Sequence, residues 1–138
     1  MTVTFKVTVT LIYGENLCYT LKDMNETKPP TFHIREIPIY GDAILAPMDG
    51  YSDWPFRSIC RELGSAMSYT EFVKVEKILS RSKEPAKRLY FTDVERPITF
   101  QIYGDDPDLI LKAALKIQEL NSDIIDLNMG CPAKSIAD

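Results

Sequence analysis

The sequence predicts an α/β protein, specifically the N-terminal half of a TIM (β/α)8 barrel with about four βα units, preceded by a β-rich extension. Short apolar runs near residues 43, 66, 98 and 123 alternate with helical patterns, which is typical of a parallel sheet covered by helices. An open doubly wound sheet shares this pattern. Polar residues and glycines gather where the runs end, however, and a barrel places its active site on that rim. Such barrels typically need about 250 residues, so 138 residues correspond to half of one.

Residues 1–33 are interpreted as an extension of uncertain origin, and residues 34–138 as the half-barrel. Apolar residues alternate with Thr and Lys from Val3 to Leu11, which predicts a half-buried strand. Residues 17–21 could form a returning strand, and residues 25–30 read as a linker because they end in two prolines.

The first βα unit is expected to begin with a strand over residues 43–48. Asp53 is a candidate N-cap for a helix that Gly64 ends, with an apolar face formed by Phe56, Ile59, Cys60 and Leu63. Trp54 and Phe56 are expected to pack this helix on the sheet, whereas Asp53 and Arg57 are interpreted as a cap and a surface pair.

Three further strands follow, over residues 66–70, 98–103 and 123–128. A helix is expected at residues 73–79, and a polar excursion then leads to Pro97. Asp106 followed by Pro107 is a strong helix start, and apolar residues after it recur at the spacing of one buried face.

The composition is that of an ordinary globular protein, with 45% hydrophobic residues and a net charge of −4. Residues 73–88 nevertheless carry six Lys or Arg against two Glu, either a solvated helix face or a phosphate-facing patch. Three widely spaced cysteines and one histidine argue against a metal site and a disulfide framework, and a reducing cytoplasm is the simplest compartment. No apolar run approaches the ~18–20 residues of a membrane helix.

Cys131 is the leading candidate for chemistry, although most free cysteines are small buried hydrophobes. Gly130 allows a ligand to approach the backbone, and Pro132 fixes the exit of the loop. As a nucleophile the thiol would need a base, and no histidine is nearby, so the sequence favours a general acid.

Two amide side chains complete the candidate site. Asn128 could cap its own turn or contact a ligand, because an amide offers a donor and an acceptor to a uracil or flavin ring edge. Gln101 lies within a predicted buried strand and needs partners for both ends of its amide, which favours ligand contact. Pro47 and Met48 offer an apolar surface for a flat ring, and Lys134 is either solvated or a phosphate contact.

Several linked motifs resemble the N-terminal part of the tRNA-dihydrouridine synthases, in that family's order and spacing over roughly residues 34–138. They are Ala46-Pro47-Met48-Asp49-Gly50, Ser52-Asp53 with Phe56-Arg57, Thr70-Glu71-Phe72-Val73, Gln101-Ile102-Tyr103-Gly104 and Asp126-Leu127-Asn128-Met129-Gly130-Cys131-Pro132-Ala133-Lys134. The resemblance implies an FMN-dependent TIM barrel followed by a small helical domain.

The resemblance also implies a reaction, in which NADPH or NADH reduces FMN and the flavin passes hydride to carbon 6 of a tRNA uridine. Cys131 then matches the proton donor to carbon 5; Pro47, Met48, Asp49 and Gln101 match flavin contacts; and Asn128 matches a position beside the base. Lys134, the last residue of the motif at residues 126–134, is a candidate substrate contact. An enzyme of this kind would be an oxidoreductase that reduces a carbon–carbon double bond and needs no metal.

The family's later strands supply a lysine, a histidine and glycine-rich phosphate loops, and these and the helical domain are absent from the 138 residues. We therefore expect the chain alone to be inactive. Two alternatives remain: another FMN barrel that reduces a free pyrimidine, similar to dihydroorotate dehydrogenase, and an inactive half-barrel that serves as a partner module.

Overall fold

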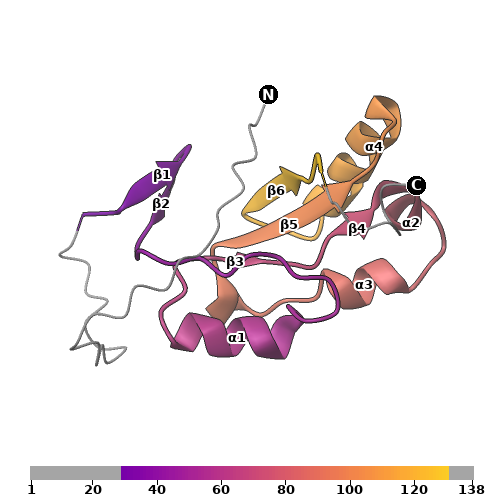
Figure 1. Cartoon of the computed structure of the whole chain (residues 1–138). Helices are drawn as coiled ribbons and strands as arrows, with labels where there is room; N and C mark the ends of the chain where they lie inside the picture. Colours follow the sequence, from indigo (N-terminus) through magenta and orange to yellow (C-terminus); the bar gives the residue numbers. More distant parts are fainter. Residues whose placement is uncertain (1–28, 131–138) are drawn as a thin grey trace.

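The fold is built around a single parallel sheet, and the computed structural model describes residues 29–130 (Figure 1). The central strand is β5 (Ile98–Tyr103). Two short strands, β3 (Ser68–Tyr69) and β4 (Val73–Lys74), pair with it in succession along one side, and β6 (Ile124–Leu127) pairs along the other. All these pairings are parallel, so the prediction of an α/β protein with a parallel sheet is confirmed.

In the described residues the strands occupy three side-by-side positions in the sheet, because β3 and β4 share one position and β5 and β6 take the other two. The sequence predicts four strands side by side. The prediction of a strand over residues 43–48 is wrong, because this segment forms no ladder. Ala43 accepts one backbone hydrogen bond from Ala66 N at 2.8 Å, but the next contact, from Leu45 N, goes to the Ser65 hydroxyl at 3.1 Å. A side chain thus takes the place of the backbone partner that a strand would need.

Within residues 29–130, five helical segments accompany the strands. They are α1 (Trp54–Glu62), α2 (Val75–Leu79), α3 (Glu84–Arg88), the 3-10 helix η2 (Asp93–Glu95) and α4 (Pro107–Gln118). The caps of α1 and α4 are as expected: Asp53 Oδ1 accepts from Phe56 N, and Asp106 Oδ1 accepts from Asp108 N and Leu109 N. The polar excursion before Pro97 contains α3 and η2, which the sequence pattern did not predict.

The two faces of the sheet differ in chemistry. Phe100 and Ile102 of β5 belong to the main core with residues of α2 and α4, such as Ile78 and Ile117. Side chains alternate along a strand, so Thr99 and Gln101 lie on the opposite face, and register places Gln101 beside Asp126 of β6. All three are buried, which gives this second face a polar interior.

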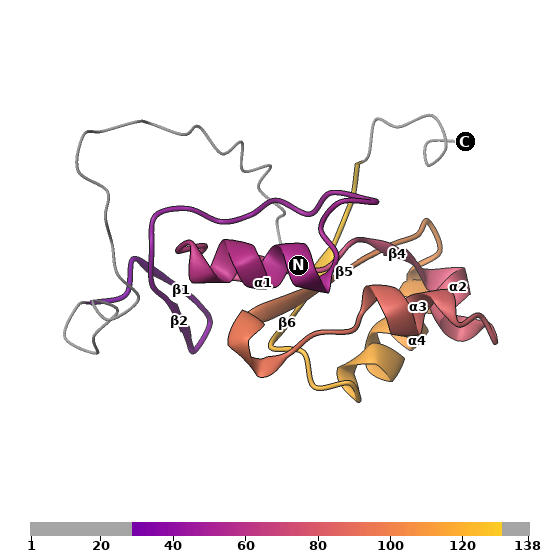
Figure 2. The same cartoon turned by 90° about the horizontal axis from the view of Figure 1, so that it is seen from below.

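A β-hairpin closes one end of the second face. Its strands β1 (Phe32–Ile34) and β2 (Ile37–Ile39) are antiparallel, and Ile39 packs with Ala66 and Met67 where β3 begins. In both views the hairpin lies at the opposite end of the molecule from α2 and α3 (Figure 1 and Figure 2). The predicted boundary after residue 33 falls inside β1, and the strands predicted between residues 3 and 21 lie outside the described residues.

Helix α1 presents a different face from the one expected. Phe56, Ile59 and Leu63 are exposed, the last at 82%, whereas Arg57 is 1% exposed. The predictions that Phe56 packs on the sheet and that Arg57 lies at the surface are therefore wrong. The helix is attached through polar contacts of Arg57 and Arg61, whose guanidinium groups donate to backbone carbonyls of neighbouring segments.

Candidate functional site

The predicted site residues that the structure describes lie on three segments. Pro47, Met48 and Asp49 occupy the loop before α1, Gln101 lies in β5, and Asn128 directly follows β6. Cys131 and Lys134 lie outside the described residues, so their predicted roles remain predictions.

Gln101 and Asn128 are brought together by neighbouring parallel strands. Asn128 N donates to Ile102 O at 2.9 Å, which extends the ladder by one residue and sets the Asn128 side chain next to β5. Asn128 Nδ2 then donates to Gln101 Oε1 at 3.4 Å, and Asn128 Oδ1 accepts from Gly130 N at 3.0 Å. The amide therefore caps its own turn, one of its two expected roles, and also contacts the second amide.

Gln101 is held by two further side chains. Its Nε2 donates to Asp126 Oδ2 at 2.7 Å, and its backbone N donates to Thr70 Oγ1 at 3.2 Å. Asp126 is the first residue of the motif at residues 126–134, and a carboxylate within a buried strand carries the same sequence signal as a buried glutamine. Burial, followed by the charge of Asp126, raises the pKa of the nearby Tyr69.

The loop around Met48 is fixed by a tight turn. The Ser52 hydroxyl accepts from Met48 N at 2.9 Å and donates to Met48 O at 3.0 Å. Gly50 adopts a positive φ of 78°, and its N–H donates to the Glu71 carboxylate at 2.5 Å. Met48 is left 38% exposed.

Arg88 of α3 connects this loop to the end of β3. Its guanidinium contacts Asp49, and it lies 3.6 Å from Glu71 and 3.3 Å from Glu84. Partial burial lowers the pKa of Arg88, but the hydrogen bond and charge of Asp49, with the charges of Glu71 and Glu84, outweigh it and raise that pKa above its ordinary value. The Asp49 carboxylate is thereby directed toward Arg88.

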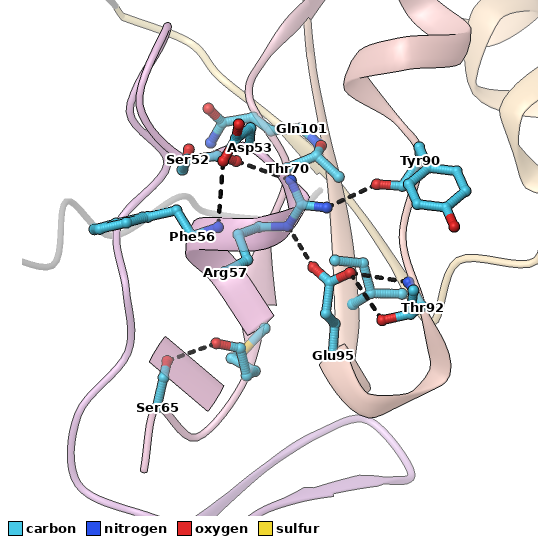
Figure 3. A network of polar contacts seen from close by, with 12 residues as sticks. Ser52, Asp53, Phe56, Arg57, Ser65, Thr70, Tyr90, Thr92, Glu95 and Gln101 are labelled. Carbon is cyan, nitrogen blue, oxygen red and sulfur yellow. Dashed lines mark hydrogen bonds and ion pairs between the residues drawn. The ribbon is translucent and has the colours of Figure 1, made fainter. Parts of the chain in front are cut away.

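A second, buried arginine supports the same loop from below (Figure 3). Arg57 donates to Glu95 Oε2 at 2.6 Å, to Ser52 O at 2.8 Å and to Tyr90 O at 2.7 Å. Glu95 Oε1 also accepts from Thr92 N at 2.9 Å, so both ends of the ion pair have further partners. Ser52 is bonded to Arg57 through its carbonyl, and its hydroxyl bonds the backbone N–H and C=O of Met48, so the Arg57 network also holds the Met48 backbone.

Two clefts open near the loop and Arg88. The larger, of about 450 Å³, is lined by Asp53, Trp54, Glu71, Ala86, Lys87, Arg88 and Tyr90. The smaller, of about 210 Å³, is lined by Asp49, Phe72, Lys74, Lys77, Glu84, Arg88 and Tyr103. Gln101 and Asn128 line neither of these two clefts.

The basic stretch is partly neutralised by its own acids. Lys74 pairs with Glu76 at 3.5 Å and Lys77 with Glu84 at 3.2 Å, all of them well exposed. This arrangement agrees with a solvated helix face. In the described part of the chain no three His, Cys, Asp or Glu side chains gather to hold a metal ion, and no helix is long and apolar enough to span a membrane.

Comparisons with known proteins place residues 44–138 in one sequence family. These residues match the family described as "Dihydrouridine synthase (Dus)". The chain is 42% identical over 97 residues to a probable tRNA-dihydrouridine synthase of Aquifex aeolicus, covering 70% of this chain and 30% of that protein. It is 44% identical over 93 residues to tRNA-dihydrouridine synthase B of Pseudomonas aeruginosa, covering 67% of this chain and 28% of that protein. The chain thus spans about 30% of the length of these relatives.

Proposed function

Because the chain belongs to the dihydrouridine synthase family, we propose that it forms part of an enzyme that reduces uridine in tRNA to 5,6-dihydrouridine. The observation that carries this proposal is the Gln101–Asn128 amide pair, which lies within the residues that match the family. One amide within β5 and one directly after the neighbouring strand β6 suit recognition of a heteroaromatic ring edge, because each amide offers a donor and an acceptor.

Two features of the described residues support an FMN ring as the ligand: the donor and acceptor chemistry of the amides and the open space at two glycines. Gln101 and Asn128 each keep a second amide hydrogen and a second lone pair beyond the bonds described here. A Cβ at Gly50 or Gly130 would meet no atom within 4 Å, so the backbone at both positions faces open space. Pro47 and Met48 would supply the apolar contact, with Asp49 beside them.

FMN, when bound, supplies the hydride that reduces the pyrimidine double bond, with NADPH or NADH as the source of electrons. The chain's own contribution is to orient the rings and to deliver one proton. Gln101 holds the cofactor ring edge, and Asn128 lies beside the target base. Cys131 would donate its thiol proton to carbon 5 and would be left as a thiolate that regains a proton from solvent; a bound flavin would supply the hydride for carbon 6.

The substrate is proposed to be tRNA in the cytoplasm. A uridine must leave its stack to reach a ring at the ends of buried strands, as base-modifying enzymes generally require. Lys134, two residues after Pro132, is proposed to contact the nucleotide. The rest of the barrel and a helical domain are proposed to complete the RNA surface. A free-pyrimidine reductase is less favoured, since the relatives that match are named for tRNA.

The proposal can be tested by transplanting the segment. Residues 44–138 would replace the matching segment of the Aquifex aeolicus relative, and dihydrouridine in tRNA would be measured by mass spectrometry of nucleosides. We expect the transplant to retain flavin and form dihydrouridine, and Cys131→Ala to reduce the rate by about 10²–10⁴-fold, the usual contribution of a positioned proton donor.

Cys60→Ala is the matched control. Cys60 is a half-buried free cysteine in α1, and that helix carries none of the proposed site residues. We expect this variant to keep the activity of the transplant. Normal activity in Cys131→Ala would refute the proton-donor role, whereas a flavin-loaded transplant that leaves tRNA uridine unchanged would refute the proposed reaction.

A further inference from the structure

Three hydrogen bonds on the second face of the sheet run in series. Gln101 Nε2 donates to Asp126 at 2.7 Å, Asn128 Nδ2 donates to Gln101 at 3.4 Å, and Gly130 N donates to Asn128 at 3.0 Å. The series begins at a carboxylate that is 8% exposed and ends one residue before Cys131.

The direction of the series is determined at its Asp126 end. There the Gln101 NH₂ group donates to the Asp126 carboxylate, which accepts the bond. Oε1 of Gln101 then faces Asn128 and must accept from the Asn128 NH₂ group. This leaves Asn128 Oδ1 to accept from Gly130 N, so each amide has one defined orientation.

We propose that Asp126 is a positioning residue that fixes the orientation of the Gln101 and Asn128 amides and holds the backbone at Gly130. Its effect on a ligand rests on the proposed function. Rotation of the Gln101 amide by 180° would exchange the positions of its NH₂ group and its carbonyl oxygen. A donor would then face a donor, or an acceptor an acceptor, on the ring edge of the ligand.

Burial makes this constraint effective. Gln101 is 5% exposed, so water does not readily replace a lost partner, and polarised hydrogen bonds in such an environment support one another. Thr70 holds the Gln101 backbone but not its amide, so Asp126 and Asn128 alone orient the side chain among the contacts described here.

Nuclear magnetic resonance of the isotope-labelled 138-residue chain tests the series without relying on activity. In the unmodified chain we expect scalar couplings across two hydrogen bonds, from Gln101 Nε2 to the Asp126 carboxyl carbon and from Gly130 N to the Asn128 side-chain carbonyl carbon. Couplings across the β5–β6 ladder provide the internal reference. If the ladder couplings are seen and the Gln101–Asp126 coupling is not, the proposal is overturned.

Asp126→Asn keeps the shape but allows either orientation at the start of the series. We expect the Gln101 and Asn128 side-chain signals to split into two sets and the Gly130 N–H signal to shift. Asp123→Asn is the matched control, because Asp123 precedes β6 and accepts from Ile98 N and Arg96, away from the amides. We expect it to leave the amide signals unchanged. A single, unshifted set of signals in Asp126→Asn would also overturn the proposal.

Addition of FMN at millimolar concentration separates this inference from the proposed function. In the unmodified chain and in Asp123→Asn we expect the Gln101 side-chain signals to move, and in Asp126→Asn we expect that response to be lost. A response in Asp126→Asn equal to that of the unmodified chain would refute the positioning role. No response in any chain would instead count against FMN as the ligand, while the couplings still decide the role of Asp126.

Discussion

Arg57 and Glu95 form an ion pair that is almost fully removed from water, with side-chain exposures of 1% and 0%. Desolvating two charges is costly, and their attraction compensates only when further hydrogen bonds satisfy the remaining donors and acceptors. Here the carbonyls of Ser52 and Tyr90 and the N–H of Thr92 provide those bonds. Neither member of the pair can therefore be removed without leaving a buried charge.

We expect Glu95→Ala to lower the free energy of unfolding by about 3–5 kcal/mol, because it leaves the Arg57 guanidinium buried and unpaired. Urea unfolding followed by circular dichroism would measure the change. Glu76→Ala removes the acid of the exposed Lys74 pair and should cost no more than about 1 kcal/mol. Equal costs for the two variants would contradict the assignment of the buried pair as a structural anchor.

Single residues also show where sequence reasoning reaches its limit. Gln101 could be predicted as a site residue because a glutamine within a buried strand needs polar partners, whatever the rest of the fold is. Arg57 could not, since its burial depends on Glu95, which is 38 residues away in the chain. Helical spacing of Phe56, Ile59 and Leu63 predicted a buried apolar face, but the arginine network holds the other face of α1 against the protein.

Among the elements, the bounds of β5 and the start of α4 agree with the prediction, because local signals define them. Asp106 and Pro107 start α4, and an uninterrupted apolar run ending at Gly104 defines β5. The segment 43–48 was assigned to a strand from the same kind of apolar run, and the assignment failed because a strand exists only when a neighbour supplies backbone partners. Helix α3 and η2 were missed because their residues are mainly polar.

The N-cap of α4 gives the element-scale prediction. Asp106 accepts two backbone hydrogen bonds in the first turn, at 2.8 and 3.2 Å, so Asp106→Ala should lower stability by about 0.5–2 kcal/mol. Thermal or urea unfolding would measure the loss. Asp105→Ala removes an exposed neighbouring carboxylate outside the cap and should change stability by less than about 0.5 kcal/mol. A larger loss in the control would mean that the cap is not the source of the effect.

At the scale of the whole molecule, we expect the described residues to form one wall of the proposed flavin site. The polar face of β5 and β6 presents the two amides, the Met48 loop is anchored separately, and the two clefts are lined by other residues. The parallel sheet is as predicted, whereas the half-barrel remains a prediction. Closure of a barrel depends on strands that pair with the outer edges of this sheet, and local sequence pattern cannot specify that pairing.

This arrangement predicts how the 138-residue chain should bind its proposed cofactor. Ligand sites typically bury 70–90% or more of the ligand surface, and a single wall cannot do so. We therefore expect a dissociation constant for FMN weaker than about 1 µM, which corresponds to a binding free energy less favourable than about −8 kcal/mol. Equilibrium dialysis followed by flavin absorbance would measure it.

The transplant of residues 44–138 into the Aquifex aeolicus relative is the control, because it restores the remaining walls and should keep flavin through gel filtration. Stoichiometric flavin on the purified 138-residue chain would contradict this expectation and would mean that residues 1–138 already enclose the ring.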